Sequence, residues 1–204
     1  SEEPDFDWNS LKGKTVLGGR AGGMPQMVLE YVLKQKGIDL SEIDIVQNID
    51  FGLTAGAFSG GQGDYTVEFE PGATSLELSG DGYVVASLGV ESGYVPYTAY
   101  CAKQSFIDDN PEIISGFTRA IEKGMAYVAS HSSEDIAEII APQFADIDVD
   151  KIAIIIERYK SQDTWKTDPT FEKEAFELLK DILKGAGELD VDVPYEDLVM
   201  KPLT

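Results

Sequence analysis

The sequence predicts an α/β protein whose first half holds a parallel, doubly wound sheet and whose second half is mostly helical. Three observations support this fold class. Short β-rich segments alternate with short helical segments as far as about residue 88, which is the pattern of parallel βαβ units. The expected strands are nearly continuous apolar runs, as in strands buried on both faces. After residue 102, apolar residues recur at helical spacing almost to the C-terminus.

The first half is expected to begin with a polar strap of about ten residues, followed by four strands. These strands are residues 14–18, 43–49, 64–69 and 83–88. Gly18–Pro25 (GGRAGGMP) forms a glycine-rich turn that leads into a helix ending before Gly37. One face of that helix is marked by Met24, Met27, Val28, Tyr31 and Val32. Shorter helices are expected at residues 51–58 and from Pro71 onward.

The second half is expected to be a series of helices that follows an aromatic, β-rich crossing at residues 93–102 (GYVPYTAYCA). The boundary between the two halves falls near residues 93–98. Helix starts are indicated by a capping residue, in two cases next to a proline. They lie at Asn110-Pro111, at Ser132 or Ser133, at Asp148 and at Asp168-Pro169, the last helix ending at Gly185 and Gly187. The final stretch, residues 193–200, can form one more short helix.

Composition excludes several classes of function. The chain has 204 residues, with 16 basic and 37 acidic side chains, for a formal charge of -21. Such a surface repels nucleic-acid phosphates and anionic lipids. A single cysteine and a single histidine exclude an internal disulfide, a thiolate zinc site and a cage of several histidines. No apolar run approaches the 18 residues of a membrane span. We therefore expect no metal and no cofactor.

The strongest candidate site is the glycine turn. Glycines allow the backbone to approach a ligand closely, and the start of the following helix offers free N–H groups at the positive end of its dipole. These features suit a carboxylate, a phosphate or the polar edge of a heterocycle. The turn lacks the Lys-Ser/Thr pair of a P-loop and the spacing of a dinucleotide-binding motif. A tight turn with no ligand is the alternative.

Each of the other candidate site residues also has a purely structural explanation that accounts for it at least as well. Glu68 and Glu70 fall on one face of an expected strand, with Glu70 at its carboxyl end, yet both can be ordinary surface acids. Asp64 reads as a turn or strand-start residue. His131 is expected to cap a helix C-terminus, and Cys101 to be a small buried apolar residue.

Aromatic residues near the proposed boundary form another group of candidates. Tyr94, Tyr97 and Tyr100 lie in the crossing, and Thr98 is adjacent to one of them. Trp165 follows a helix further on. Clefts between lobes are common ligand sites and are often lined by aromatic residues. Packing in the core is the alternative for each aromatic residue.

A series of short motifs resembles a known family. The motifs are LKGKT (11–15), GGMP (22–25), GDY (63–65), FEP (69–71), VPYT (95–98) and ERYKSQDTW (157–165), in that order. Together they resemble the substrate-binding proteins of ABC importers. The likeness is to the subgroup of NMT1/THI5-like thiamine-precursor binders and of sulfonate, nitrate and taurine binders. No single motif is specific, but their order and spacing are.

The resemblance implies a two-lobed fold of the type II periplasmic-binding class that closes on a small solute. It divides the chain into a strap or hinge at 1–11, a complete α/β lobe two at 12–94, and a hinge strand with the helical C-terminal half of lobe one at 95–204. The N-terminal part of lobe one would then lie outside this sequence. The implied ligand-binding residues are Arg20, Gly22, Gly23, Met24, Pro25, Glu70, Tyr97, Thr98 and Trp165.

The implied function is capture of a small heterocyclic, thiamine-pyrimidine-precursor-like solute, or of a sulfonate-like solute, without catalysis. The implied partners are that solute and a membrane permease, and the implied location is extracytoplasmic, in the periplasm or on a lipoprotein anchor. One alternative is an enzyme like the thiamine-pyrimidine synthases, whose cysteine-rich iron motif has no counterpart here. Another is a truncated interaction module that binds no solute, or a remnant without function. A homo-oligomer through the incomplete lobe is a further expected partner.

Overall fold

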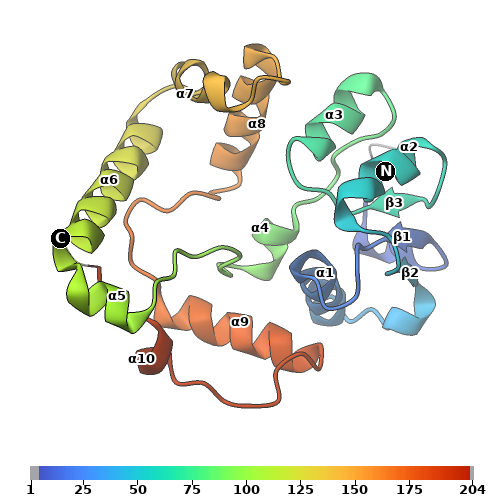
Figure 1. The fold of residues 1–204 in the computed structure, drawn as a ribbon. Helices are drawn as coiled ribbons and strands as arrows, with labels where there is room; N and C mark the ends of the chain where they lie inside the picture. Colours follow the sequence, from blue (N-terminus) through green and yellow to red (C-terminus); the bar gives the residue numbers. More distant parts are fainter. Residues whose placement is uncertain (1–4, 203–204) are drawn as a thin grey trace. The chain divides into compact units, whose positions relative to one another are not determined.

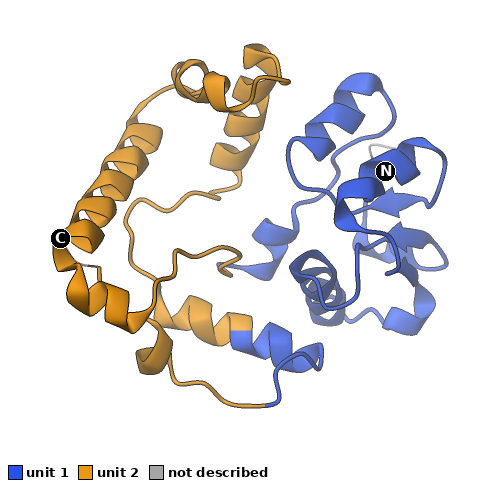
Figure 2. Ribbon diagram, viewed as in Figure 1, with its two compact units in different colours: residues 1–94, 180–190 blue, residues 95–179, 191–204 orange. Residues whose placement is uncertain are grey.

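The computed structural model describes residues 5–202 (Figure 1). The chain divides into two compact units, shown in blue and orange in Figure 2. Unit 1 comprises residues 1–94 and 180–190, and unit 2 comprises residues 95–179 and 191–204. A short helical segment near the C-terminus of the chain therefore belongs to the N-terminal unit. The assignment of these units to lobes stays a prediction.

Unit 1 contains a three-stranded parallel sheet, which confirms the predicted class. The strands are β1 (Thr15–Leu17), β2 (Asp44–Val46) and β3 (Tyr65–Thr66), in the order β2-β1-β3. In the central strand Val16 pairs with Ile45 on one side and with Tyr65 on the other. The strands are shorter than the apolar runs that predicted them.

The fourth strand expected at residues 83–88 does not form. Residues 84–87 have no regular structure, and α4 (Leu88–Ser92) begins where the strand was predicted to end. The backbone N–H of Val84 bonds to the Glu77 carboxylate (3.2 Å) instead of to a strand. The Ser87 hydroxyl accepts from the Val90 N–H (3.3 Å) and so starts a helix. A nearby carboxylate thus binds one backbone donor of the expected strand, and a helix begins at the end of that run.

Helices and 3-10 turns connect the strands of unit 1. They are η1 (Trp8–Leu11), α1 (Met24–Gln35), η2 (Leu40–Glu42), η3 (Phe51–Leu53), α2 (Thr54–Ser59) and α3 (Gly72–Ser79). Helix α1 ends just before Gly37, whose φ of 72° is the left-handed conformation expected of a residue after a helix.

The sheet of unit 1 has an apolar core on each face, because successive side chains of β1 point to opposite sides. Val16 packs in a cluster with α1 residues Leu29 and Leu33. Leu17 packs on the other side with Phe58 of α2 and Leu76 of α3. A sheet covered on both faces accounts for the nearly continuous apolar composition of the strands.

The regular elements of unit 2 are all helices over its described residues. Its helices are α5 (Gln104–Asp109), α6 (Pro111–Ser130), α7 (Ser133–Ile140), η4 (Ala141–Gln143), α8 (Val149–Ser161), the first part of α9 (Lys173–Gly185), and α10 (Tyr195–Leu198). The predicted starts at Pro111 and Ser132 are confirmed, and Ser132 Oγ accepts from the Asp135 N–H (3.1 Å). Over residues 5–202, no helix is long and apolar enough to cross a membrane.

Two local predictions for this unit are wrong. Residues 94–103 contain no strand, so the expected hinge strand is an irregular segment. Helix α9 begins at Lys173 and not at Asp168-Pro169. The Asp168 carboxylate accepts from the Thr170 N–H (2.8 Å), and this turn uses the capping group before the helix starts.

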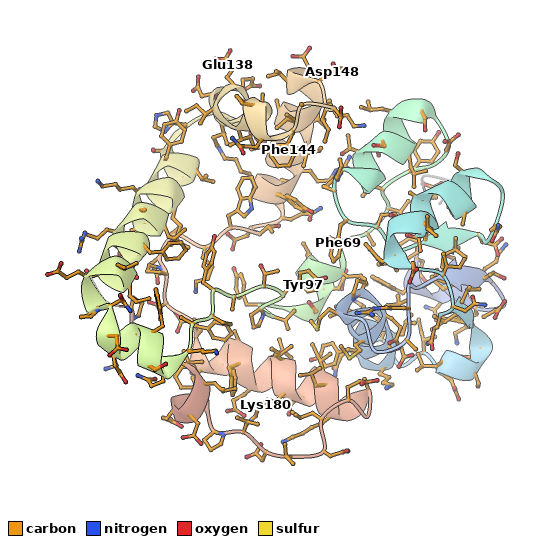
Figure 3. All side chains as sticks on the ribbon, viewed as in Figure 1. Phe69, Tyr97, Glu138, Phe144, Asp148 and Lys180 are labelled. Atoms are coloured by element: carbon orange, nitrogen blue, oxygen red, sulfur yellow. The ribbon has the colours of Figure 1, made fainter. Side chains whose placement is uncertain are left out.

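The core of unit 2 lies between α7 and α8. Ile136 and Ala137 of α7 meet Ile152 and Ile156 of α8, and all four are buried. Phe144, labelled in Figure 3, lies on the connection between these helices and is 45% exposed. By contrast, the 20-residue helix α6 has no buried residue.

Candidate functional site

The glycine turn lies at the carboxyl end of the central strand and leads directly into α1. Two backbone bonds fasten it to the end of β2. The Gly18 N–H bonds to the Val46 carbonyl (3.1 Å), and the Ala21 N–H bonds to the Gln47 carbonyl (3.2 Å). The carboxyl edge of a parallel sheet is where open α/β proteins bind ligands. The turn is therefore held in a fixed place at the edge that can receive a solute.

Two glycines of the turn have no room for a side chain. A Cβ on Gly19 would lie 2.9 Å from Phe51 Cδ2, and the φ of Gly19 is +83°. A Cβ on Gly18 would lie 2.9 Å from Ile45 Cγ2. Glycine is thus required both by conformation and by close approach. Phe51 in turn contacts Phe69, with ring centroids 4.7 Å apart, so an aromatic pair flanks the turn.

Gln26 holds the other end of the turn, a role that the sequence prediction missed. Its Oε1 accepts from the Gly22 N–H (3.0 Å), and its Nε2 donates to Glu30. Gln47 Nε2 also donates to Glu30 Oε1 (3.0 Å), and Gln26 itself is 5% exposed. Gln26 stands three residues after the helix N-cap, Gly23, where Gln or Glu often reaches back to the backbone. That spacing was the available signal.

Few backbone donors remain at the start of α1. The Met27 N–H bonds to the Gly23 carbonyl (3.0 Å), and Pro25 has no N–H. Within residues 5–202, the N–H groups of Met24 and Gln26 have no acceptor. Arg20 is exposed, and its carbonyl accepts from the Gly23 N–H (3.1 Å), whereas its guanidinium forms no ion pair or hydrogen bond with any described residue. The turn therefore presents a cation and two backbone donors.

A carboxylate lies against the same turn. Glu188 Oε1 would be 2.8 Å from a Cβ placed on Gly22, whose φ is +72°. The segment carrying Glu188 is fastened to unit 1, because Lys34 Nζ donates to the Gly185 carbonyl (3.1 Å). The Glu188 N–H also bonds to the Leu183 carbonyl (2.9 Å) across Gly187, as in a Schellman end. The turn thus combines a hydrogen-bond acceptor with its donors.

Glu68 is half-buried beside the N-terminal ends of α2 and α3. Its Oε1 accepts from Thr66 Oγ1 (2.7 Å), and Thr54 also donates to it. Its Oε2 lies 3.1 Å from the position of a Cβ on Gly72. Burial raises the pKa of the Glu68 carboxyl, while the hydrogen bonds from the two threonines oppose that rise. Helix N-termini favour a carboxylate, so this position has a structural role.

Glu70, the predicted ligand residue of this strand, is engaged with α3. Its Oε2 accepts from the Thr74 N–H and its Oε1 from Thr74 Oγ1, both at 2.9 Å. Its contribution to a ligand site stays a prediction. Asp64 is confirmed as a strand-start residue, since it accepts from the Thr15 N–H (2.9 Å) and from Lys14 Nζ (3.2 Å). The bond from Thr15, followed by that from Lys14, lowers the pKa of Asp64.

The remaining predicted ligand residues lie in unit 2. Tyr97 (labelled in Figure 3) is 57% exposed, and Thr98 beside it is exposed as well. Trp165 packs against the α7/α8 core and makes an edge contact with Tyr159, with centroids 6.0 Å apart. The structure thus gives Trp165 the packing role that was its alternative. Whether these three residues contact a ligand stays a prediction.

The two reactive side chains singled out by composition have ordinary surroundings. Cys101 is exposed, so the prediction that it is buried is wrong; it lies in the irregular segment at residues 94–103 and not in a strand. His131 is the C-cap of α6, as predicted, and stacks on Tyr127 with centroids 3.6 Å apart. Its Nδ1 lies 2.9 Å from the Tyr127 carbonyl. Within the described ranges, no group of His, Cys, Asp and Glu side chains could hold a metal ion.

The sequence matches known proteins over most of its length. A family model described as NMT1/THI5 like matches residues 7–135. A protein of Bacillus subtilis (strain 168), provisionally named as the binding protein YtlA, is 48% identical over 199 residues. That match covers 97% of this chain and 60% of the Bacillus protein, so the chain spans about three fifths of that relative's length.

A solved structure has the same fold. It is of a protein from Bordetella bronchiseptica RB50, with a TM-score of 0.62 and 21% sequence identity. The match covers 91% of this chain and 62% of the Bordetella protein. At this identity the likeness concerns the fold alone.

Proposed function

Because the chain belongs to the NMT1/THI5 like family, we propose that it is a solute-binding component of an ABC importer. Its similarity to a protein named for binding, and not for a reaction, supports a binding role. The extracytoplasmic location and the membrane permease partner are parts of the same proposal. Capture of a solute needs no bond to be made or broken, so the site must supply only shape and hydrogen bonds.

The observation that carries the proposal is the construction of the glycine turn. Its backbone is fastened to β2, its glycines are tightly packed, and Gln26 holds its Gly22 N–H group. Such a turn is rigid before any ligand arrives, and rigid sites lose less entropy on binding. The free donors of Met24 and Gln26 then face no competing acceptor among the described residues.

The chemistry at the turn favours a small heterocycle with both donors and acceptors. Arg20 and the backbone N–H groups suit acceptor atoms, whereas the Glu188 carboxylate suits a donor. Phe51 and Phe69 add an aromatic surface for a flat ring. A sulfonate would use only the donors and would meet the carboxylate of Glu188 at close range, so it is the second choice.

Isothermal titration with an aminopyrimidine and with taurine tests this proposal. We expect the aminopyrimidine to bind, and Arg20→Ala to weaken its binding about tenfold, the loss of about 1.4 kcal/mol that one charge-assisted bond can supply. Arg119→Ala is the control, because Arg119 is an exposed arginine of unit 2. Binding of neither compound argues against the solute classes proposed. Binding that both variants leave unchanged argues against the glycine turn as its site.

A further inference from the structure

Helix α6 (yellow-green in Figure 1) has one strongly apolar face. Its 20 residues span about 30 Å at the usual helical rise. Its charged side chains all fall on the opposite face, and they are Glu112, Arg119, Glu122 and Lys123. We call the uncharged side the α6 face, and its residues are Ile113, Ile114, Phe117, Ala120, Ile121, Gly124, Met125 and Val128. An amphipathic helix of this length is expected to bury such a face against another layer.

The α6 face is left largely open. No residue of α6 is buried, and Ile113 is 58% and Phe117 45% exposed. Two residues of the face do have neighbours. Tyr100 makes an edge contact with Phe117 at 4.8 Å, and Val128 packs against the α7/α8 core. The shorter helices α7 and α8, by comparison, bury Ile136 and Ile152. The difference indicates that the α6 face has a partner outside the elements of unit 2.

We propose that the α6 face docks a polypeptide equivalent to the part of the Bacillus subtilis relative that lies outside the match. That part, called here the complementary segment, is 40% of the Bacillus protein, since 60% is matched. The solved Bordetella structure also extends beyond the match, because 62% of its chain is covered. Both longer proteins therefore carry enough additional chain to supply a layer against this helix, whether joined to it or as a separate polypeptide.

The composition of the surface favours a protein layer over a lipid one. The net charge of -21 repels anionic membranes. Small residues, Ala120 and Gly124, lie between the large apolar side chains of the α6 face, which allows another backbone or side chain to approach closely. Within the described part of unit 2 there is no strand against which α6 could pack. A sheet or helix layer from the complementary segment would meet that need.

Co-expression of the 204-residue chain with the complementary segment tests the proposal. We expect the two to co-purify as a one-to-one complex by light scattering, with slower hydrogen exchange over residues 111–130 than in the chain alone. The double substitution Ile113→Ser with Phe117→Ser is expected to weaken association at least tenfold. Ile139→Ser with Phe144→Ser is the matched control, because these residues are 60% and 45% exposed and the pair loses the same two side chains. Circular dichroism verifies that each variant is folded.

Three results would overturn the proposal. The first is a chain that remains alone when the complementary segment is present. The second is a complex that the double substitution in α6 weakens no more than the control pair does. The third is a homo-oligomer of the chain that the double substitution dissociates, because the occupant of the α6 face would then be a second copy. None of these results depends on solute binding, so they leave the proposed function to its own test.

Discussion

The tight packing of the glycine turn leads to a quantitative prediction for Gly19→Ala. Two costs apply at this position. The φ of +83° is unfavourable for an L-residue by about 1–2 kcal/mol. The new Cβ would also lie 2.9 Å from a ring carbon of Phe51, and overpacking of this kind costs about 1–3 kcal/mol. Together the substitution should lower the free energy of unfolding by about 2–5 kcal/mol.

Gly61→Ala separates the two costs. Gly61 has the same φ of +83°, but nothing lies within 4 Å of its Cβ position, so only the backbone cost of about 1–2 kcal/mol applies. Urea unfolding followed by far-ultraviolet circular dichroism measures both variants, with the slope m checked for constancy. Combining Gly19→Ala with Phe51→Leu should recover part of the larger loss. Equal losses for the two glycine variants would refute the argument that Phe51 closes the turn.

Three further outcomes are expected. Gln26→Ala should lower the free energy of unfolding by about 1 kcal/mol in urea, because it removes the side chain that accepts from the Gly22 N–H (3.0 Å). Glu68 has a pKa raised by burial, so the folded state holds its proton more tightly than the unfolded state. Glu68 therefore stabilises the folded protein at pH values below the pKa of this group in the unfolded chain, and the stabilisation is lost as the pH rises through its pKa in the folded protein. In thermal melts from pH 4 to 8, Glu68→Gln should reduce the dependence of the melting temperature on pH. Trp165→Ala should destabilise unit 2 by about 2–4 kcal/mol, seen as faster hydrogen exchange in α7 and α8, whereas unchanged exchange would contradict its packing role.

Features that depend only on residues close in the sequence were predictable. The three strands of the sheet follow from apolar runs, and the starts of α6 and α7 follow from Pro111 and Ser132, whose effects are local. The run at residues 83–88 has the same composition as a strand. It fails to form one because Ser87 caps a helix and Glu77 binds the Val84 N–H. The apolar composition of the run does not reveal that these side chains compete with a neighbouring strand for its backbone groups.

The candidate site was only partly predictable for a related reason. The glycine turn was predicted from its own sequence, whereas Gln26 was missed, although its position three residues after the N-cap was an available signal. Glu188 gave no such signal, because its approach to Gly22 depends on a segment that is remote in the chain. The bond from Lys34 to Gly185, which fastens that segment, joins residues 151 positions apart. Trp165 was ambiguous because a half-buried tryptophan suits both a core and a ligand surface.

The return of residues 180–190 to unit 1 also has a bearing on how the chain folds as it is synthesised. When residue 94 has emerged from the ribosome, residues 180–190, which complete unit 1, have not yet been synthesised. At about 5–20 residues per second, that segment emerges roughly 5–20 s later. During this interval the glycine turn would lack the support of Glu188 and Gly185. The nascent N-terminal unit must therefore wait until residues 180–190 have emerged before it reaches its final form.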